Sequence, residues 1–181
     1  MIYNQDFHKV EDFVELFNRE FSDCNTRLQA GADEPFYQAP VDHKPAIIFS
    51  TQDYFSSALH ECAHWCIAGE KRRQMDDYGY WYAADGRTPK QQQEFFRVEQ
   101  KPQALEWAFA LASNLPFRLS LDNLNNPSGD GKAFREQVFS ALKDYFEHGF
   151  PPRATRMIQM LCRYYRQGHP IQIPDISTCS I

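Results

Sequence analysis

Residues 59 to 66, LHECAHWC, contain two histidines four positions apart, with a glutamate directly after the first. On an α-helix, residues i and i+4 lie about 40° apart around the axis and about 6 Å apart along it. His60 and His64 would therefore project from one face, where both imidazoles can bind one ion. Glu61 would lie about 100° from His60, near enough to reach a water on that ion but badly placed to bind it. The pattern predicts a site for zinc, iron or another first-row transition metal.

Two histidines need a further ligand, and the sequence leaves the choice open. The metallopeptidase pattern with a glycine and a third histidine shortly after the second histidine is absent. A long helix expected further along the chain offers three carboxylates, at Glu94, Glu99 and Glu106. Glu99 and Glu106 share one helical face with Gln103, so Glu106 is a candidate partner for the ligand itself. Pro102 is expected to kink that helix or divide it in two, next to Glu99.

A site of two histidines and one carboxylate leaves metal positions open, and two reactions fit it. With zinc, Glu61 would be the general base that acts on a bound water in peptide hydrolysis. With ferrous iron, the open positions would take dioxygen and a co-substrate. In a third alternative the metal only braces the fold, and Cys62 or Cys66 is recruited as a ligand. The two cysteines also fit a simpler role as small core residues. The motif by itself favours the hydrolase.

Helical and extended patterns alternate in the first part of the chain and must position the motif. Phenylalanines at helical spacing predict a helix within residues 7–24. Three short extended segments follow, at residues 26–30, 35–40 and 45–50. The last of these is apolar and β-branched, which predicts a buried strand. The metal motif would then lie on a helix from Asp53 to Ala68. Ser50 or Thr51 would cap its start, and Gly69 would end it.

The remainder of the chain is predicted to be mostly helical. Residues 76–89 indicate an aromatic strand that ends in a turn. Helices are expected at residues 90–113, 133–148 and 153–167. Residues 121–132 have the composition of a loop. The sum is an α+β fold: a helix-rich single domain, residues 1–181, with a small sheet and a central metal-binding helix, and with an irregular tail at residues 169–181.

Composition excludes some classes of function. The net charge of −5 argues against a general nucleic-acid binder. No apolar run approaches the roughly 18 residues of a membrane span, and no signal peptide is expected from the first residues. Five cysteines are an odd number without the spacing of a disulfide framework, so we expect reduced thiols and a cytoplasmic protein.

Four blocks of the sequence resemble the elongation factor P hydroxylase family. They are DEPFY at residues 33–37, HECAHWCIAGEKRR at 60–73, DYGYWYAADGR at 77–87 and VEQKPQALEW at 98–107. The similarity runs from NTRL through LDNL, a little over half of the chain. The order and spacing of the blocks make the resemblance far more specific than the histidine motif alone.

The resemblance implies an iron-dependent enzyme whose substrate is the β-lysylated lysine of elongation factor P, which it hydroxylates. The family's metal motif resembles His-x-x-x-His with a later glutamate, which matches His60, His64 and Glu99. The expected cofactor is Fe(II), with Zn as the other possibility, and Glu61 becomes a neighbour of the ligands or a proton carrier. The alternative is a zinc metallopeptidase-like hydrolase with Glu61 as general base. The expected partner is lysylated elongation factor P, with no direct contact to nucleic acid or membrane.

A long cationic lysyl-lysine arm would be bound by carboxylates and aromatic walls. Asp76 and Asp77 are candidates for the charge, although they also fit a solvated turn. Tyr78 and Tyr80 are candidates for the walls. Near the C-terminus a segment without acidic residues carries Arg153, Arg156, Arg163 and Arg166. Such a run is typical of a solvated helix face, and the sharper hypothesis is a docking face for an acidic protein surface.

Overall fold

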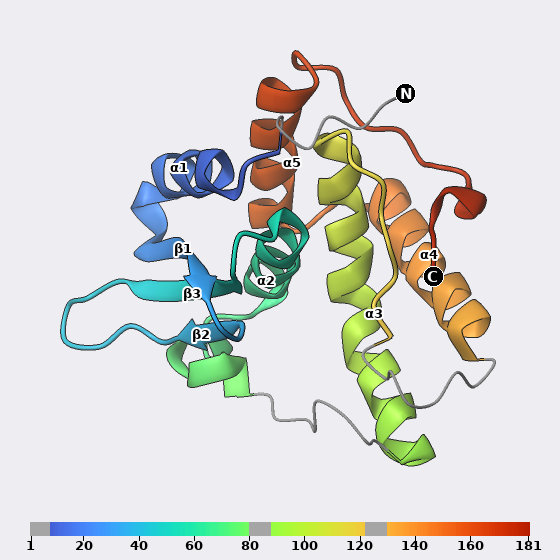
Figure 1. Cartoon of the computed structure of the whole chain (residues 1–181), viewed down its shortest axis with the longest axis horizontal. Coiled ribbons are helices and arrows are strands. Elements are labelled where there is room, and N and C mark those ends of the chain that lie inside the picture. Colours follow the sequence, from blue (N-terminus) through green and yellow to red (C-terminus); the bar gives the residue numbers. More distant parts are fainter. Residues whose placement is uncertain (1–7, 80–87, 122–129) are drawn as a thin grey trace. The chain divides into compact units, whose positions relative to one another are not determined.

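The computed structural model describes residues 8–79, 88–121 and 130–181. The chain divides into two compact units, Met1–Tyr80 and Trp81–Ile181. Within the described residues there are five α-helices and one three-stranded sheet, besides short 3-10 turns (Figure 1). The prediction of a helix-rich α+β fold with a small sheet is therefore confirmed. The expectation of one domain over residues 1–181 stays a prediction.

The N-terminal unit contains a three-stranded sheet, with one helix before it and one helix after it in the sequence. Its elements are α1 (Val10–Glu20), β1 (Thr26–Ala32), β2 (Phe36–Gln38), β3 (Ala46–Thr51) and α2 (Phe55–Ile67). The strand order is β1-β3-β2, with β3 parallel to β1 and antiparallel to β2. Ile48 of β3 pairs with Leu28 on one side and Tyr37 on the other. All three side chains are buried, so the predicted buried strand at residues 45–50 is confirmed as the centre of the sheet.

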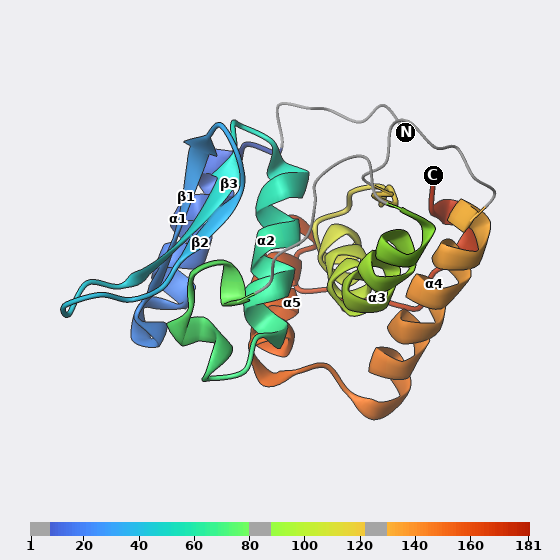
Figure 2. The ribbon, with the colours of Figure 1, turned by 90° about the horizontal axis from the view of Figure 1, so that it is seen from below.

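Aromatic side chains hold α1 and α2 together in this unit. Trp65 of α2 is 1% exposed and packs edge-on against Phe17 and Phe21, with ring centroids 5.3 and 5.1 Å away. Phe55, at the start of α2, contacts Phe13 in a tilted arrangement, with ring centroids 5.3 Å apart and planes inclined by 42°. Burying such large rings is the main favourable term in fixing α2, and Figure 2 shows this helix alongside one face of the sheet.

Side chains form hydrogen bonds with the backbone at both edges of the sheet. On the β1 edge, Asn18 accepts a hydrogen bond from the Leu28 N–H at 2.8 Å and donates one to its carbonyl at 3.0 Å. On the β2 edge, the carboxylates of Asp77 and Asp76 accept from the N–H groups of Tyr37 and Ala39. Exposed strand edges invite pairing with other chains. In this sheet the backbone groups at these positions are satisfied within the unit.

The C-terminal unit is formed by α3 (Pro89–Ala112), α4 (Asp130–His148) and α5 (Pro152–Tyr165). Both α4 and α5 pack against α3 (Figures 1 and 2). Phe96 of α3 stacks on Phe134 of α4 with centroids 4.2 Å apart. Thr88 and Gln91 form a reciprocal capping box at the start of α3, with Pro89 as its first residue. None of the helices in the described residues is long and apolar enough to cross a membrane.

Several predicted boundaries differ from the structure. The first helix ends at Glu20 and gives way to a 3-10 turn, Ser22–Cys24, before the left-handed residue Asn25. Neither Ser50 nor Thr51 caps α2; its N-cap is Tyr54, without a side-chain cap. Instead the hydroxyl of Ser57 accepts from the Thr51 N–H. The end of the helix agrees with the prediction, because its C-cap is Ala68 and Gly69 follows, although Gly69 does not have a positive φ.

Two further expectations differ from the structure. Pro102 does not divide α3, which continues through it, and the alternative of a kink stays a prediction. Residues 76–79 form a 3-10 turn, η4 (Asp76–Gly79), where the start of an aromatic strand was predicted. The rest of that segment, residues 80–87, lies outside the described residues, as does most of the predicted loop at 121–132. The predicted last two helices are confirmed as α4 and α5.

Candidate metal centre

The two histidines of the motif converge, as their helical spacing predicts. The Nε2 atoms of His60 and His64 lie 3.1 Å apart, and their ring centroids 4.8 Å apart. Two imidazoles bound to one ion at about 2.0–2.1 Å each have nitrogens roughly this far apart. A hydrogen bond from the N–H of one ring to the nitrogen of the other fits the same distance. Both side chains are half-buried, whereas Leu59, Cys62 and Ala63 beside them are fully buried. The pair is therefore compatible with a metal and accessible from one side.

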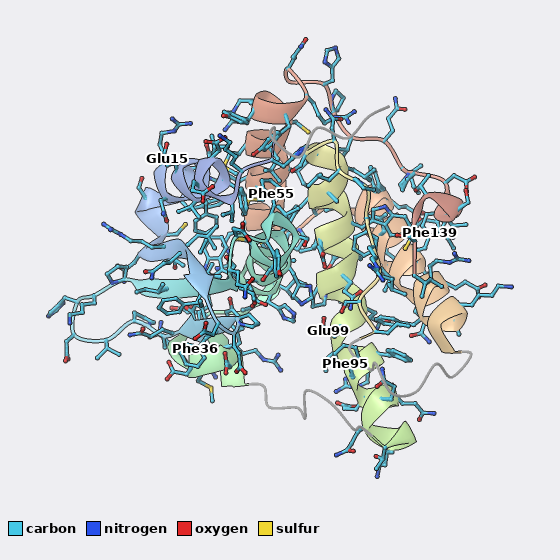
Figure 3. The ribbon with its side chains drawn as sticks, in the orientation of Figure 1. Glu15, Phe36, Phe55, Phe95, Glu99 and Phe139 are labelled. Carbon is cyan, nitrogen blue, oxygen red and sulfur yellow. The ribbon has the colours of Figure 1, made fainter. Side chains whose placement is uncertain are left out.

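Glu99 is a buried carboxylate near the middle of α3, one helical turn after Phe95 (Figure 3). Its side chain is only 1% exposed. It belongs to a buried polar stripe on this helix, whose members are Gln92, Glu99, Gln103 and Glu106. Burial of a carboxylate costs several kcal/mol unless cationic or hydrogen-bonding groups compensate it. A divalent cation is one such group.

Burial separates Glu99 from Glu94, whereas Glu106 is buried as well. Glu94 is exposed and bonds to Arg97, whose Nε lies 2.9 Å from its Oε2. This hydrogen bond with Arg97 lowers the pKa of Glu94. Glu106 is 8% exposed, and its predicted role as a partner of the ligand stays a prediction.

His60 and His64 in the N-terminal unit and Glu99 in the C-terminal unit carry side chains of types that bind metal ions. Imidazole nitrogen and carboxylate oxygen are donors that iron and zinc both accept. A second group, Asp144, Glu147 and His148, is fully exposed on α4. Exposed acidic clusters are common without any ion, so this second group has no evident role.

Glu61 is half-buried and acts electrostatically on its surroundings. Burial raises the pKa of Tyr78 well above its ordinary value, and the negative charge of Glu61 is the next cause. Glu61 also raises the pKa of Cys62, after burial and the neighbouring Cys66. The Glu61 carboxylate therefore lies within electrostatic reach of the Tyr78 hydroxyl, on the same helix as the histidine pair.

Cys62 and Cys66 behave as core residues. They are 0% and 3% exposed, and all five cysteines of the chain are free. Burial raises the pKa of the Cys62 thiol, and the neighbouring Cys66 is the next cause. Neither cysteine belongs to a group that could hold a metal in the described part of the chain. These observations favour packing over the closed, four-ligand structural site.

Three of the four predicted substrate residues, Asp76, Asp77 and Tyr78, lie in the η4 turn. Asp76 and Asp77 bind the backbone of β2 through their carboxylates, as described above, although both residues are exposed. Tyr78 is 4% exposed, and its ring stacks on Tyr37. Tyr80 lies outside the described residues. Sequence reasoning missed Tyr37, although the DEPFY block that ends on it was a signal.

Arg166, one of the four arginines in the predicted docking face, has a structural role instead. Its guanidinium donates to the Leu111 carbonyl and to the Asn114 side chain at the end of α3. It also bonds to the carbonyl oxygens of His169 and Pro170, which fixes the turn after α5. The docking role of the other three arginines stays a prediction.

Comparisons with known proteins add independent information. A family model described as elongation factor P hydroxylase matches residues 16–175. A protein named elongation factor P lysine hydroxylase, from Haemophilus influenzae (strain ATCC 51907 / DSM 11121 / KW20 / Rd), is 44% identical over 175 residues. That match covers 95% of this chain and 98% of the relative. Both matches extend well beyond the blocks that carry the sequence resemblance.

Proposed function

Because this chain belongs to the elongation factor P hydroxylase family, an enzyme family, we propose that it hydroxylates a lysine side chain of elongation factor P. The observation that carries the proposal is the 44% identity to the lysine hydroxylase of H. influenzae over nearly the whole of both chains. The proposed substrate is elongation factor P whose lysine already carries β-lysine. A cytoplasmic location is part of the same proposal.

The proposed metal ligands are His60, His64 and Glu99. In support, the two histidine nitrogens lie 3.1 Å apart on α2, and Glu99 is the most deeply buried of the carboxylates that spacing offered. The proposed metal is Fe(II), with Zn as the alternative. Bound iron would supply the activation of dioxygen, since two histidines and one carboxylate leave coordination positions open.

Each residue then has a defined task. His60 and His64 bind through the nitrogens of neutral imidazoles. Glu99 contributes a negative charge that lowers the net charge of the buried centre. Glu61, next to His60 in the sequence, is placed to hold or carry a proton. Cys62, Ala63 and Trp65 surround the motif with buried apolar groups, which limit the access of water.

Asp76, Asp77, Tyr78 and Tyr80 remain the proposed contacts for the cationic substrate arm. Asp76 and Asp77 are exposed, and each uses one carboxylate oxygen on β2. Their second oxygens give the turn further capacity to accept hydrogen bonds from an ammonium group. This part of the proposal rests on charge and position in the turn alone.

The test is an oxygen-dependent mass change in the substrate. The protein would be purified anaerobically, loaded with ferrous iron and incubated with lysylated elongation factor P under oxygen. We expect a gain of about 16 Da, one oxygen atom, by intact-mass spectrometry. Glu99→Ala should abolish the gain, whereas Glu94→Ala, an exposed carboxylate earlier on the same helix, should retain it.

Other outcomes would contradict the proposal. No gain in mass with a correctly folded, iron-loaded protein would reject the hydroxylase function. Tight zinc binding with peptide cleavage in the absence of oxygen would instead support the zinc hydrolase. An equal loss in both glutamate variants would leave the reaction standing but remove the case for Glu99 as the ligand.

A further inference from the structure

Three rings of the N-terminal unit form an aromatic column next to the motif. Tyr37 of β2 and Tyr78 of η4 have centroids 4.1 Å apart and planes inclined by only 16°. The Tyr78 ring is in turn nearly parallel to the His64 imidazole, at 6.3 Å and 15°. Offset parallel rings at such distances attract one another. The column therefore connects the sheet to one of the two converging histidines.

The backbone that presents Tyr78 is strained. Asp77 and Tyr78 are consecutive non-glycine residues in the left-handed region, with φ values of 47° and 55°. Each such residue costs roughly 1–3 kcal/mol and persists only where its surroundings impose it. Turns with two consecutive left-handed residues favour glycine, asparagine and aspartate, so a tyrosine at the second position is unusual.

Hydrogen bonds to β2 impose this conformation here. The Asp77 carboxylate accepts from the Tyr37 N–H at 3.1 Å, and the Asp76 carboxylate accepts from the Ala39 N–H at 2.9 Å. The Tyr37 hydroxyl donates to the Arg73 carbonyl at 2.9 Å, just before the turn. Tyr37 thus holds the turn through its backbone N–H and its hydroxyl. Its ring also packs on the Tyr78 ring. The Tyr78 ring is 4% exposed, so nearly all of its surface packs within the protein and only an edge is left for a substrate.

We propose that Tyr78 is a positioning residue that fixes the orientation of the His64 imidazole. The outer torsion of a histidine side chain is broad and soft, so His64 alone would sample orientations that turn Nε2 away from His60. A parallel ring against one face restricts this rotation and keeps the two Nε2 atoms converging before a metal arrives. The inference rests on the proposed function, because it takes the histidine pair as metal ligands.

The test compares metal binding in variants that keep or remove the ring. Affinity for Co(II) would be measured anaerobically, without substrate, by competition with a chromophoric chelator. Tyr78→Leu removes the ring, and we expect affinity to fall about 10–100-fold, as for loss of other groups that orient a ligand. Tyr78→Phe keeps the ring and should restore binding to within about threefold. Phe36→Leu is the matched control, because this ring of β2 is 38% exposed and packs on Phe49 rather than in the column.

Two spectroscopic readouts separate positioning from a general loss of structure. The visible d–d absorption of bound Co(II) should change in Tyr78→Leu but not in Tyr78→Phe, since it reports ligand geometry. In the metal-free parent, NMR should show ring-current shifts of the His64 ring protons that Tyr78→Leu abolishes. The NMR measurement on the parent and Tyr78→Phe decides the matter even if Tyr78→Leu does not fold.

Unchanged Co(II) affinity in folded Tyr78→Leu would overturn this inference and leave the proposed function intact. So would the absence of ring-current shifts at His64 in the parent. Failure of the parent to bind any metal would overturn the proposed function and this inference with it. Loss of affinity in Tyr78→Leu with rescue in Tyr78→Phe supports the positioning role.

Discussion

At the scale of single residues, the candidate centre combines two half-buried imidazoles with carboxylates in different surroundings. Glu61 is half-buried on α2, and Glu99 is 1% exposed on α3. A half-buried carboxylate can exchange protons with water, whereas a fully buried one is stable as an anion only beside compensating groups. Exchange with water suits the proposed role of Glu61 in proton transfer. Burial beside compensating groups suits the proposed role of Glu99 as a metal ligand.

The substitution Glu61→Gln tests this division and also separates the two metal chemistries. It removes the charge and the proton-carrying ability while keeping the shape of the side chain. We expect Fe(II) binding to change by less than about threefold, because Glu61 is not a proposed ligand, and hydroxylation to fall by about 10²–10⁴-fold if it carries a proton in the reaction. Chelator competition and turnover assays measure the two effects. A variant that loses metal would show Glu61 to be a ligand, against the helical geometry of the motif.

Glu99→Gln addresses the proposed third ligand by a readout that needs no turnover. An amide retains the volume but lacks the anionic oxygen, so Fe(II) affinity should fall by more than the roughly 10–100-fold typical of losing an orienting neighbour. Glu94→Gln, at an exposed position on the same helix, is the control and should bind as the parent does. Equal affinities for the parent and Glu99→Gln would require another carboxylate as the ligand, with Glu106 the next to test.

At the scale of elements, α3 carries its polar stripe because individual side chains tie it to the chain that follows. The Gln103 amide donates to the Ser120 carbonyl at 2.9 Å and accepts from its N–H at 3.1 Å. Gln92 donates to the Leu121 carbonyl at 3.2 Å. Two glutamines thus hold residues 120–121 along α3. Glu99 lies between them on the same stripe.

Gln103→Ala should accordingly destabilise the protein. Gln103 is 0% exposed, and its loss leaves a cavity and removes both hydrogen bonds to Ser120. We expect the free energy of unfolding to fall by about 1–3 kcal/mol. The control is Gln93→Ala, an exposed position on the same helix, where the effect should stay within about 0.5 kcal/mol. Urea unfolding followed by circular dichroism measures both, and similar values for the two variants would show that the stripe contributes no stability.

The elements also show which features a sequence can predict. The helix with His60 and His64 and the buried strand at 45–50 follow from periodicity, which is a local property of the chain. The cap of α2 was wrong because Ser57, inside the helix, takes the hydrogen bond expected of a residue before it. Pro102 does not divide α3, since Leu105, Trp107 and Ala108 in the following turn are buried and their packing stabilises the helix. Tertiary packing overrode local preference at these positions.

The candidate centre was predictable to a similar extent. The histidine pair needs only helical geometry, but spacing left Glu99 and Glu106 as alternatives, and only the family resemblance favoured Glu99. The left-handed turn at Asp77 and Tyr78 was beyond sequence reasoning, because its cause is a hydrogen bond to Tyr37, 40 positions earlier. The prediction of an aromatic strand there was based on side-chain type and did not include this contact.

At the scale of the whole molecule, the described residues have the buried core and the hydrogen bonds that allow a protein to fold without a metal. The aromatic core around Trp65 is fully buried, both sheet edges are satisfied by Asn18 and by the η4 turn, and five free cysteines leave the fold without disulfides. A chain of 181 residues is long enough to be stable on such burial alone. A metal would then act as a ligand of a folded protein, which distinguishes the catalytic site from one that braces the structure.

Removal of the metal tests this difference for the entire chain. A ligand that binds only the native state at 100 times its Kd adds about 2.7 kcal/mol, which corresponds to a shift of roughly 5–10 °C in Tm for a protein of this size. We therefore expect chelation to lower Tm by about this amount while the far-UV circular dichroism at 25 °C stays unchanged. A double variant, His60→Ala with His64→Ala, should melt at the same temperature with and without Fe(II), because it has lost two of the three proposed ligands. Unfolding of the parent on chelation at 25 °C would mean that the metal braces the fold, and the open, oxygen-activating site would have to be replaced by a closed structural one.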